Sequence, residues 1–269
     1  MLGENILADL RRKGKLDYFI EDFTESNYKR LLILAKDKSR ITTYEDALKN
    51  NGIVWRHDVD LSINRALALN NIEKDLGVKA YYFIHLHSSF YNVMESSITK
   101  KIKQISEGAI IGLHFEPSYY NLKTDDIETV EKWITYEKEI LENLIDIEVS
   151  YMSFHNPDVG GNWHLLPQER IGGLFNVYCD NIRNNFEYCS DSNGYWRYKR
   201  LEDVLADVDK NTRLHVLTHP GWWTPEKMLP FERIKRCIQG RANNALETYC
   251  ELLKECGRIN VGYSENEKE

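Results

Sequence analysis

The chain has 269 residues, of which 42% are hydrophobic and 29% are charged, close to the average of globular proteins, so an ordered core is expected. This length exceeds that of a typical domain, but α/β barrels of similar size often form one domain. The formal net charge of −7 argues against a nucleic acid or an anionic membrane as the partner, because both favour a basic face.

Nothing in the sequence indicates export or membrane insertion. The N-terminal segment MLGENILADLRRKGK lacks the apolar core of a signal peptide, and no apolar stretch is long enough to span a membrane. The five cysteines are odd in number and form no CxxC pair. We therefore expect a cytoplasmic protein with reduced thiols.

Helical and extended patterns alternate along the chain, without repeats or low-complexity linkers, which predicts a single domain. Helices are expected at 26–38, 61–77, 97–107, 125–145 and 231–256, and strands at 52–60, 78–86, 109–115, 149–155 and 212–219. Ser26 and Ser62 are candidate N-caps, and Gly77 is a candidate C-terminal stop. The aromatic-rich region between 156 and 211 shows no regular pattern. Apolar strands that alternate with helices predict an α/β fold with a parallel sheet covered on both faces.

Four of the predicted strands end in a residue that can titrate or bind a metal. The first ends in Arg56-His57-Asp58-Val59-Asp60, and the others end in His114, His155 and His219. Because parallel α/β folds build their sites at the carboxyl ends of the strands, we expect these side chains to converge.

The acidic pair Asp58 and Asp60 is the centre of this hypothesis. On an extended backbone, residues two apart point to the same side, and two adjacent carboxylates repel unless a cation or a shared proton relieves them. A divalent metal held by Asp60, with Asp58 beside it as a general base, satisfies this requirement, and neutral imidazoles complete a catalytic zinc shell. The alternative is that the pair only caps the following helix.

Each strand-end histidine has a structural alternative as well. His114 follows a buried strand and could be a core histidine, whereas His155 and His219 precede proline-containing turns. His219 could protonate a departing amine. His85 and His87 are weaker candidates, His57 should face away from the site, and His164 and His215 are interpreted as surface or packing residues.

Several other residues could support a site. Arg56 and Arg183 could steady a carboxylate by bidentate hydrogen bonding. The segment 189–198 is rich in turn formers and aromatics and is expected to be an ordered loop over the site, with Asp191 and Arg197 as a functional pair or as an internal salt bridge. Trp222 could stack on a sugar ring or pack as a buried wedge.

Five motifs, in order, resemble the polysaccharide-deacetylase superfamily, which includes carbohydrate esterase family 4: RHDVD, IGLHFE, SFHNP, SDSNGYWR and LTHPGWW. The likeness is greatest to a divergent subgroup encoded in surface-polysaccharide and O-antigen gene clusters, and it extends to the N-terminal segment FTESNYKRLLILAK. It implies a distorted (β/α)7 barrel spanning 1–269, with 1–50 as a helical and strand extension packed on the barrel.

The resemblance also implies roles for individual residues. Asp58 would be the catalytic base, Asp60 and His114 metal ligands, and His219 the general acid, with Zn²⁺ as the default metal and Co²⁺, Ni²⁺ or Fe²⁺ as alternatives. Where the family has a second histidine, this chain has Ser118, so His155 is the expected third ligand and Glu116 the alternative. SFHNP lacks the family's arginine, which leaves Arg56 or Arg183 to orient the base.

The leading functional prediction is a metal-dependent hydrolase that removes an N-acetyl group from an amino sugar, free or linked to a nucleotide or lipid, in surface-glycan synthesis. One alternative is another C–N hydrolase on the same fold, such as a formyl or cyclic-amide hydrolase. A second alternative is a glycan-binding or assembly protein without catalysis. The sequence makes no prediction about oligomeric state.

Overall fold

The computed structural model describes residues 18–196 and 198–263 of the chain. The predictions made for the first 17 residues, including the missing signal peptide and the start of the N-terminal extension, lie outside the described residues, as does Arg197.

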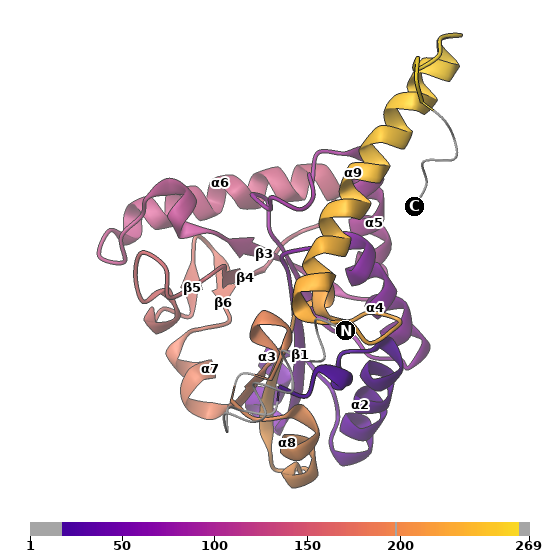
Figure 1. Ribbon diagram of the computed structural model, residues 1–269. Coiled ribbons are helices and arrows are strands. Elements are labelled where there is room, and N and C mark those ends of the chain that lie inside the picture. The colour runs from indigo at the N-terminus through magenta and orange to yellow at the C-terminus, as the bar shows by residue number, and fades with distance from the viewer. Residues whose placement is uncertain (1–17, 197, 264–269) are drawn as a thin grey trace, which may run out of the picture.

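The elements alternate between helix and strand through most of the chain (Figure 1). The helices are α2 (Glu25–Lys38), α3 (Tyr44–Asn50), α4 (Ile63–Asp75), α5 (Ser96–Ser106), α6 (Ile127–Ile145), α7 (Asp180–Asn185), α8 (Leu201–Asp207) and α9 (Pro230–Glu255). The strands are β1 (Gly52–Val59), β2 (Tyr81–Ile84), β3 (Ile110–Phe115), β4 (Tyr151–Phe154), β5 (Arg170–Ile171), β6 (Leu174–Asn176), β7 (Glu187–Ser190) and β8 (Arg213–Thr218).

All eight strands form one sheet in the order β5-β6-β4-β3-β2-β1-β8-β7. Every neighbouring pair is parallel except β5 and β6, which form an antiparallel pair at one edge. This confirms the α/β class and the parallel sheet. Within the described residues no ladder joins β5 to β7, so the sheet is open and the closed seven-stranded barrel stays a prediction.

The five predicted strands and five predicted helices are all present, with boundaries shifted by a few residues. The region between 156 and 211, expected to be irregular, instead contains β5, β6, α7, β7 and α8. These elements have seven residues or fewer, which is too short for a helical or strand period to be recognised. The segment 189–198, expected to be a loop, begins inside β7.

The ends of α2 and α4 show which of the predicted helix-capping residues are caps in the structure. Ser62 caps α4 by accepting a hydrogen bond from the Arg65 N–H, and Gly77 follows that helix with a φ of +64°, as predicted. The prediction for α2 was wrong, because its N-cap is Thr24, which accepts from the Asn27 N–H. Thr24, two positions earlier, is also a favoured cap residue, and its extended backbone conformation fits the N-cap geometry.

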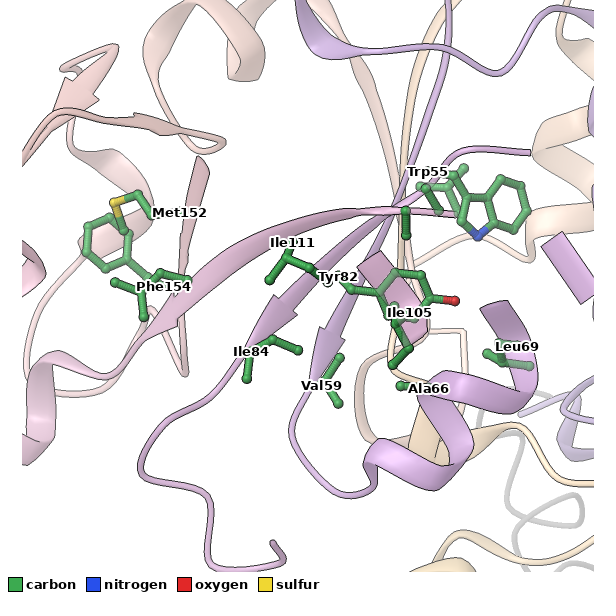
Figure 2. Packing of buried hydrophobic residues seen from close by; sticks show 14 of the residues in the cluster. Trp55, Val59, Ala66, Leu69, Tyr82, Ile84, Ile105, Ile111, Met152 and Phe154 are labelled. Carbon is green, nitrogen blue, oxygen red and sulfur yellow. The ribbon is translucent and has the colours of Figure 1, made fainter. Parts of the chain in front are cut away.

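The side chains of the strands alternate between two buried faces. On the outer face, Trp55 and Val59 of β1 join side chains from β2, β3 and β4 in one large cluster. Figure 2 shows Val59 and Tyr82 near Ala66 of α4 and Ile105 of α5, with Met152 and Phe154 of β4 farther along the sheet. The helices α8, α2, α4, α5 and α6 contact one another in that order and cover this face.

The inner face is apolar near the amino ends of the strands and polar near their carboxyl ends. Val54, Tyr81, Phe83 and Phe175 form a second cluster with Tyr44 of α3. The next inner positions on β1 are Arg56 and Asp58, both buried. The apolar cluster therefore closes one end of the inner space and leaves the other end for polar groups.

A buried polar network fixes β1 from its outer face. The Nε2 atom of His57 lies 2.6 Å from Oε1 of Glu73 in α4, and its Nδ1 atom lies 2.7 Å from the Thr218 hydroxyl of β8. Tyr28 and Tyr82 donate to the same Glu73 carboxylate, which is fully buried. His57 thus faces away from the inner space, as predicted, and every oxygen of Glu73 has a partner.

The C-terminal helix α9 is the longest element, and Figure 1 shows its later turns extending away from the sheet and the other helices. It contacts the short 3-10 helix η5 (Pro220–Trp222). In the part of the chain that the structure describes, no helix combines the length and the apolarity needed to cross a membrane.

Candidate active site

The predicted strand-end residues meet on the inner face of the sheet. The β3–β4 register pairs His114 with Ser153, and the β1–β8 register pairs His57 with Thr218, so that the next residues, Asp58 and His219, are also brought together. The carboxyl ends of four strands thereby deliver polar groups to a single place.

Asp60, His114 and His155 form a compact group of three potential ligands. The Asp60 Oδ1 atom lies 3.2 Å from Nε2 of His114 and 3.4 Å from Nδ1 of His155, and the two ring nitrogens are 3.2 Å apart. One ligand atom from each residue lies within 4.8 Å of the others. The geometry is that of one carboxylate and two imidazoles facing a common point.

These residues fit a divalent cation. Among the described residues, the buried Oδ1 of Asp60 has no hydrogen bond of good geometry, although two ring nitrogens face it. Burial by itself would raise the pKa of Asp60, but the contacts with His114 and His155 outweigh it and hold the pKa well below its usual range. An ionised carboxylate with two imidazoles and an open side is the ligand set of a catalytic zinc site.

Asp58 lies beside this group and is held by a different set of partners. Its Oδ2 accepts a hydrogen bond from Arg56 Nη2 at 2.9 Å, and its Oδ1 accepts from the Ser153 hydroxyl at 3.3 Å. Arg56 is fully buried and also donates to the Tyr178 hydroxyl at 2.7 Å. Because Ser62 caps α4, the alternative in which the acidic pair serves as a helix cap is not what the structure shows.

His219 enters the site from β8 with its orientation fixed by Asp191. Its Nδ1 lies 2.6 Å from Oδ1 of Asp191, while its Nε2 lies 3.8 Å from Oδ2 of Asp60. Burial disfavours the charged imidazole, but the charge of Asp191 outweighs it and raises the pKa of His219 to about 9. The indole N–H of Trp223 donates to the other Asp191 oxygen at 2.9 Å.

Glu116, the alternative third ligand, is directed elsewhere. It accepts hydrogen bonds from Nε2 of His85 and from the Ser118 hydroxyl, both at 2.9 Å. The bond from His85 lowers the pKa of Glu116 to about 2, and burial lowers the pKa of His85 to about 4. The ring of His85 stacks on that of His155, with 4.2 Å between the centroids. His85, Glu116 and His155 form a second group within 4.8 Å, which does not include Asp60 or His114.

The remaining predicted support residues lie farther from the carboxylates. Arg183 donates to the carbonyl oxygen of His164 and pairs with Asp180, so it does not contact Asp58. Arg197 lies outside the described residues, so its predicted pairing with Asp191 stays a prediction, and Asp191 contacts His219. Trp222 is half-buried and lines the cavity described next.

A cavity of about 480 Å³ opens onto the polar group. Asp58, Asp60, His114, His155 and His219 lie along it. Its other walls include aromatic rings, among them Phe186, Tyr188, Tyr198 and Trp222. Polar groups on one side and aromatic faces on the other suit a ligand with both polar and ring surfaces.

Two contributors to the site were missed by the sequence analysis. Ser153 lies between Nδ1 of His114, at 2.6 Å, and the Asp58 carboxylate, and Tyr178 supports Arg56. Ser153 could have been found, because it precedes His155 by two residues on a strand and so shares its face. Tyr178 follows β6, one of the strands that the sequence pattern did not reveal.

The other histidines have separate partners. His87 contacts Glu137 at 2.9 Å, and the partly buried His164 contacts Asp158 at 3.1 Å on the rim of the cavity. His215 is buried on the inner face below the site, 2.8 Å from the Tyr44 hydroxyl, which agrees with its interpretation as a packing residue.

No family model and no curated protein matches the sequence. Among solved structures, the chain is similar to the chitin deacetylase of the fungal pathogen Colletotrichum lindemuthianum, with 16% identity, a TM-score of 0.38, and coverage of 70% of this chain and 81% of that one. It is also similar to a mutant CE4 family pseudoenzyme with restored enzymatic activity, with 13% identity, a TM-score of 0.39, and coverage of 72% and 63%. These likenesses are too distant to assign a family.

Proposed function

We propose that this protein is a metal-dependent hydrolase that removes an N-acetyl group from an amino sugar of a surface-glycan precursor. The observation that carries the proposal is the triangle of Asp60 Oδ1, His114 Nε2 and His155 Nδ1, with Asp58 3.9 Å from His114 and His219 3.8 Å from Asp60. Carboxylate and imidazole ligands suit Zn²⁺, with Co²⁺, Ni²⁺ or Fe²⁺ as alternatives. A cation held there would activate water and polarise the amide carbonyl.

Asp58 is placed to take a proton from the attacking water. Its carboxylate reaches the same space as the proposed ligands, with Oδ2 3.9 Å from Nε2 of His114. Arg56 and Ser153 each occupy only one lone pair of its two oxygens, so acceptor capacity remains. The fixed orientation of this carboxylate favours its role as a general base.

His219 is placed to give a proton to the leaving amine. Asp191 engages the Nδ1 side of the ring, so the Nε2 side is presented to the cavity and to Asp60. The Asp191 carboxylate also stabilises the imidazolium form of His219, which is the form that can donate a proton. The proposed base and acid thus come from the neighbouring strands β1 and β8, and both line the cavity.

The choice of an acetylated sugar rests on the ordered resemblance of the five motifs to polysaccharide deacetylases. The cavity supports this choice, because its volume of about 480 Å³ and its aromatic walls can enclose a sugar unit rather than a polymer. We extend the proposal to a nucleotide-linked or lipid-linked amino sugar as the substrate, because the cavity has both polar and aromatic walls.

The experiment combines metal analysis with product analysis. After loading with Zn²⁺ or Co²⁺, the protein should retain about one equivalent of metal and release acetate from an N-acetylated nucleotide sugar. Asp58→Asn should keep the metal and lose turnover. A protein that retains no metal, or an Asp58→Asn variant with full turnover, would overturn the proposal. Release of formate from N-formyl substrates, without acetate release, would identify the alternative C–N hydrolase.

A further inference from the structure

The buried hydroxyl of Ser153 links a proposed metal ligand to the proposed general base. Ser153 lies near the carboxyl end of β4 and is fully buried. Its Oγ atom lies 2.6 Å from Nδ1 of His114 and 3.3 Å from Oδ1 of Asp58. A hydroxyl has only one hydrogen to donate. The direction of these two hydrogen bonds therefore decides which ring nitrogen of His114 carries a hydrogen.

The hydrogen bond between Ser153 and Asp58 has a fixed direction. Asp58 forms a buried ion pair with Arg56, with 2.9 Å between Oδ2 and Nη2. A carboxylate in such a pair can only accept hydrogen bonds, so the hydrogen of the Ser153 hydroxyl points to Asp58. The Ser153 oxygen then accepts from Nδ1 of His114. In the neutral imidazole of His114, the Nε2 atom is consequently left with a free lone pair.

The reversed direction would leave buried polar groups without partners. If Ser153 donated to Nδ1 of His114, its lone pairs would face the Asp58 oxygen. The ring hydrogen would then lie on Nε2, 3.2 Å from Oδ1 of Asp60. This contact does not have hydrogen-bond geometry, because among the described residues Oδ1 of Asp60 has no hydrogen-bond partner. Since buried groups without partners are costly, the direction from His114 through Ser153 to Asp58 is the more stable one.

The contacts of His155 continue in the same direction. Its Nδ1 lies 3.2 Å from Nε2 of His114, and its Nε2 lies 2.9 Å from the side-chain nitrogen of Asn156. Because Nε2 of His114 is an acceptor, His155 donates to it through Nδ1 and accepts from Asn156 through Nε2. His114 therefore presents a lone pair to the ligand triangle before a cation is bound, whereas His155 must first give up its Nδ1 hydrogen.

We propose that Ser153 is a positioning residue that sets the tautomer of His114 and so prepares its Nε2 atom to bind a divalent cation. The inference rests on the proposed function, in which His114 is a metal ligand. In metal sites the partner of the second ring nitrogen fixes the tautomer and the orientation of a histidine ligand. Ser153 provides this partner and also donates to Asp58, so one side chain holds both the ligand and the base.

The first test determines the tautomer of His114 in the metal-free chain. Long-range ¹H–¹⁵N correlation spectra of histidine-labelled protein at mildly alkaline pH show which ring nitrogen carries the hydrogen, and His114→Gln assigns the signals. In the wild-type chain the hydrogen is expected on Nδ1. In Ser153→Ala it should no longer be confined to Nδ1, because its acceptor has been removed. A wild-type hydrogen found mainly on Nε2, or on both nitrogens alike, overturns the proposal, as does an unchanged tautomer in Ser153→Ala.

The second test measures the affinity for Zn²⁺ by competition with a chelating dye. Ser153→Ala should raise the dissociation constant for Zn²⁺ about 10–100-fold. The matched control is Ser190→Ala, which should leave this constant unchanged, because Ser190 is also a buried serine near the carboxyl end of a strand but contacts the Ser192 hydroxyl. An unchanged constant in Ser153→Ala, or an equal rise in both variants, overturns the role of Ser153.

The two tests also separate this inference from the proposed function. A wild-type chain that binds no Zn²⁺ overturns the proposed function, and with it the role of the tautomer in metal binding. The spectra of the metal-free chain test the control of the His114 tautomer by Ser153 independently of that result.

Discussion

Asp191 holds His219 at two points, the ring Nδ1 at 2.6 Å and the main-chain N–H at 3.0 Å from the same carboxylate. Since Asp191 is fully buried and also accepts from Trp223, the carboxylate cannot turn away from the histidine. The position and the charge of the imidazole therefore depend on one residue from the segment that follows β7.

Replacing Asp191 with Asn should separate catalysis from metal binding. The amide keeps the shape of the side chain but cannot stabilise a charged imidazole, so turnover should fall roughly 100-fold, at the lower end of the effect of a positioned general acid. Metal content should not change, because Asp191 is outside the ligand group. Steady-state kinetics and metal analysis on the same sample check both parts; unchanged turnover would contradict the role of His219.

His155→Ala and Glu116→Gln should behave differently in metal binding. His155 directs Nδ1 to Asp60 and His114, whereas Glu116 is engaged by His85 and Ser118. We expect His155→Ala to lose bound Zn²⁺ after dialysis and Glu116→Gln to retain it. Measurement of metal content by mass spectrometry decides the question, and the opposite result would make Glu116 the third ligand.

The buried pair of Arg56 and Asp58 should show strong coupling in stability. Arg56→Met leaves the Asp58 carboxylate without its charged partner and should lower the free energy of unfolding by about 3–5 kcal/mol. Adding Asp58→Asn removes the unpaired charge and should recover part of this loss. Urea unfolding of both single variants and the double variant gives the coupling free energy between the two side chains. A double variant as unstable as Arg56→Met would show that the two charges do not depend on each other.

His215 should make the protein less stable in mild acid. Burial, and then the charge of Arg56, hold its pKa well below 6.5, and Tyr44 and Tyr188 are its aromatic neighbours. The folded state keeps this histidine neutral, so its contribution is fully present above the pKa of the unfolded chain and is lost as the pH falls below it. Between pH 7 and 5 the loss amounts to about 2 kcal/mol. In His215→Gln the free energy of unfolding should fall less over this interval, and an equal fall would contradict the prediction.

Two glycine substitutions should have opposite effects. A Cβ at Gly112 would lie 2.5 Å from the Phe83 ring and 3.0 Å from the carbonyl oxygen of Tyr151, so Gly112→Ala should lower the free energy of unfolding by about 1–3 kcal/mol. A Cβ at Gly240, inside α9, would meet nothing within 4 Å, and Gly240→Ala should add about 0.5–1 kcal/mol through helix propensity. Thermal unfolding of the two variants measures both changes in stability. Because Phe83 also packs beneath Arg56, Gly112→Ala should reduce turnover as well.

The sequence was sufficient to predict those features that depend on neighbouring residues alone. Strand β1, with eight buried residues and a polar end, could be recognised, and the period of two correctly predicted that His57 faces away from the side that carries Asp58. Pairings between distant segments were less accessible. The contact of Arg56 with Tyr178 and the strands β6 and β7 depend on sheet order, which short segments do not encode in their own pattern.

Asp191 is a second residue whose contacts depend on the pairing of distant segments. Its segment was predicted to lie over the site with Arg197 as its partner; Arg197 lies outside the described residues, and the partner that the structure describes is His219, 28 residues later. The sequence identified the chemistry of the residue, whereas the partner follows from the parallel pairing of β7 with β8.

The network around His57 on the outer face of β1 has a consequence for folding fidelity. If β1 paired one residue out of register, its two faces would exchange, and His57 would leave Glu73 while Asp58 entered the apolar cluster. Glu73 would then be a buried carboxylate without its imidazole partner, an error that costs several kcal/mol. The buried contacts of His57 and Glu73, which do not line the cavity, thus destabilise any shifted register of β1. The register that remains stable presents Asp58 on the side of the cavity.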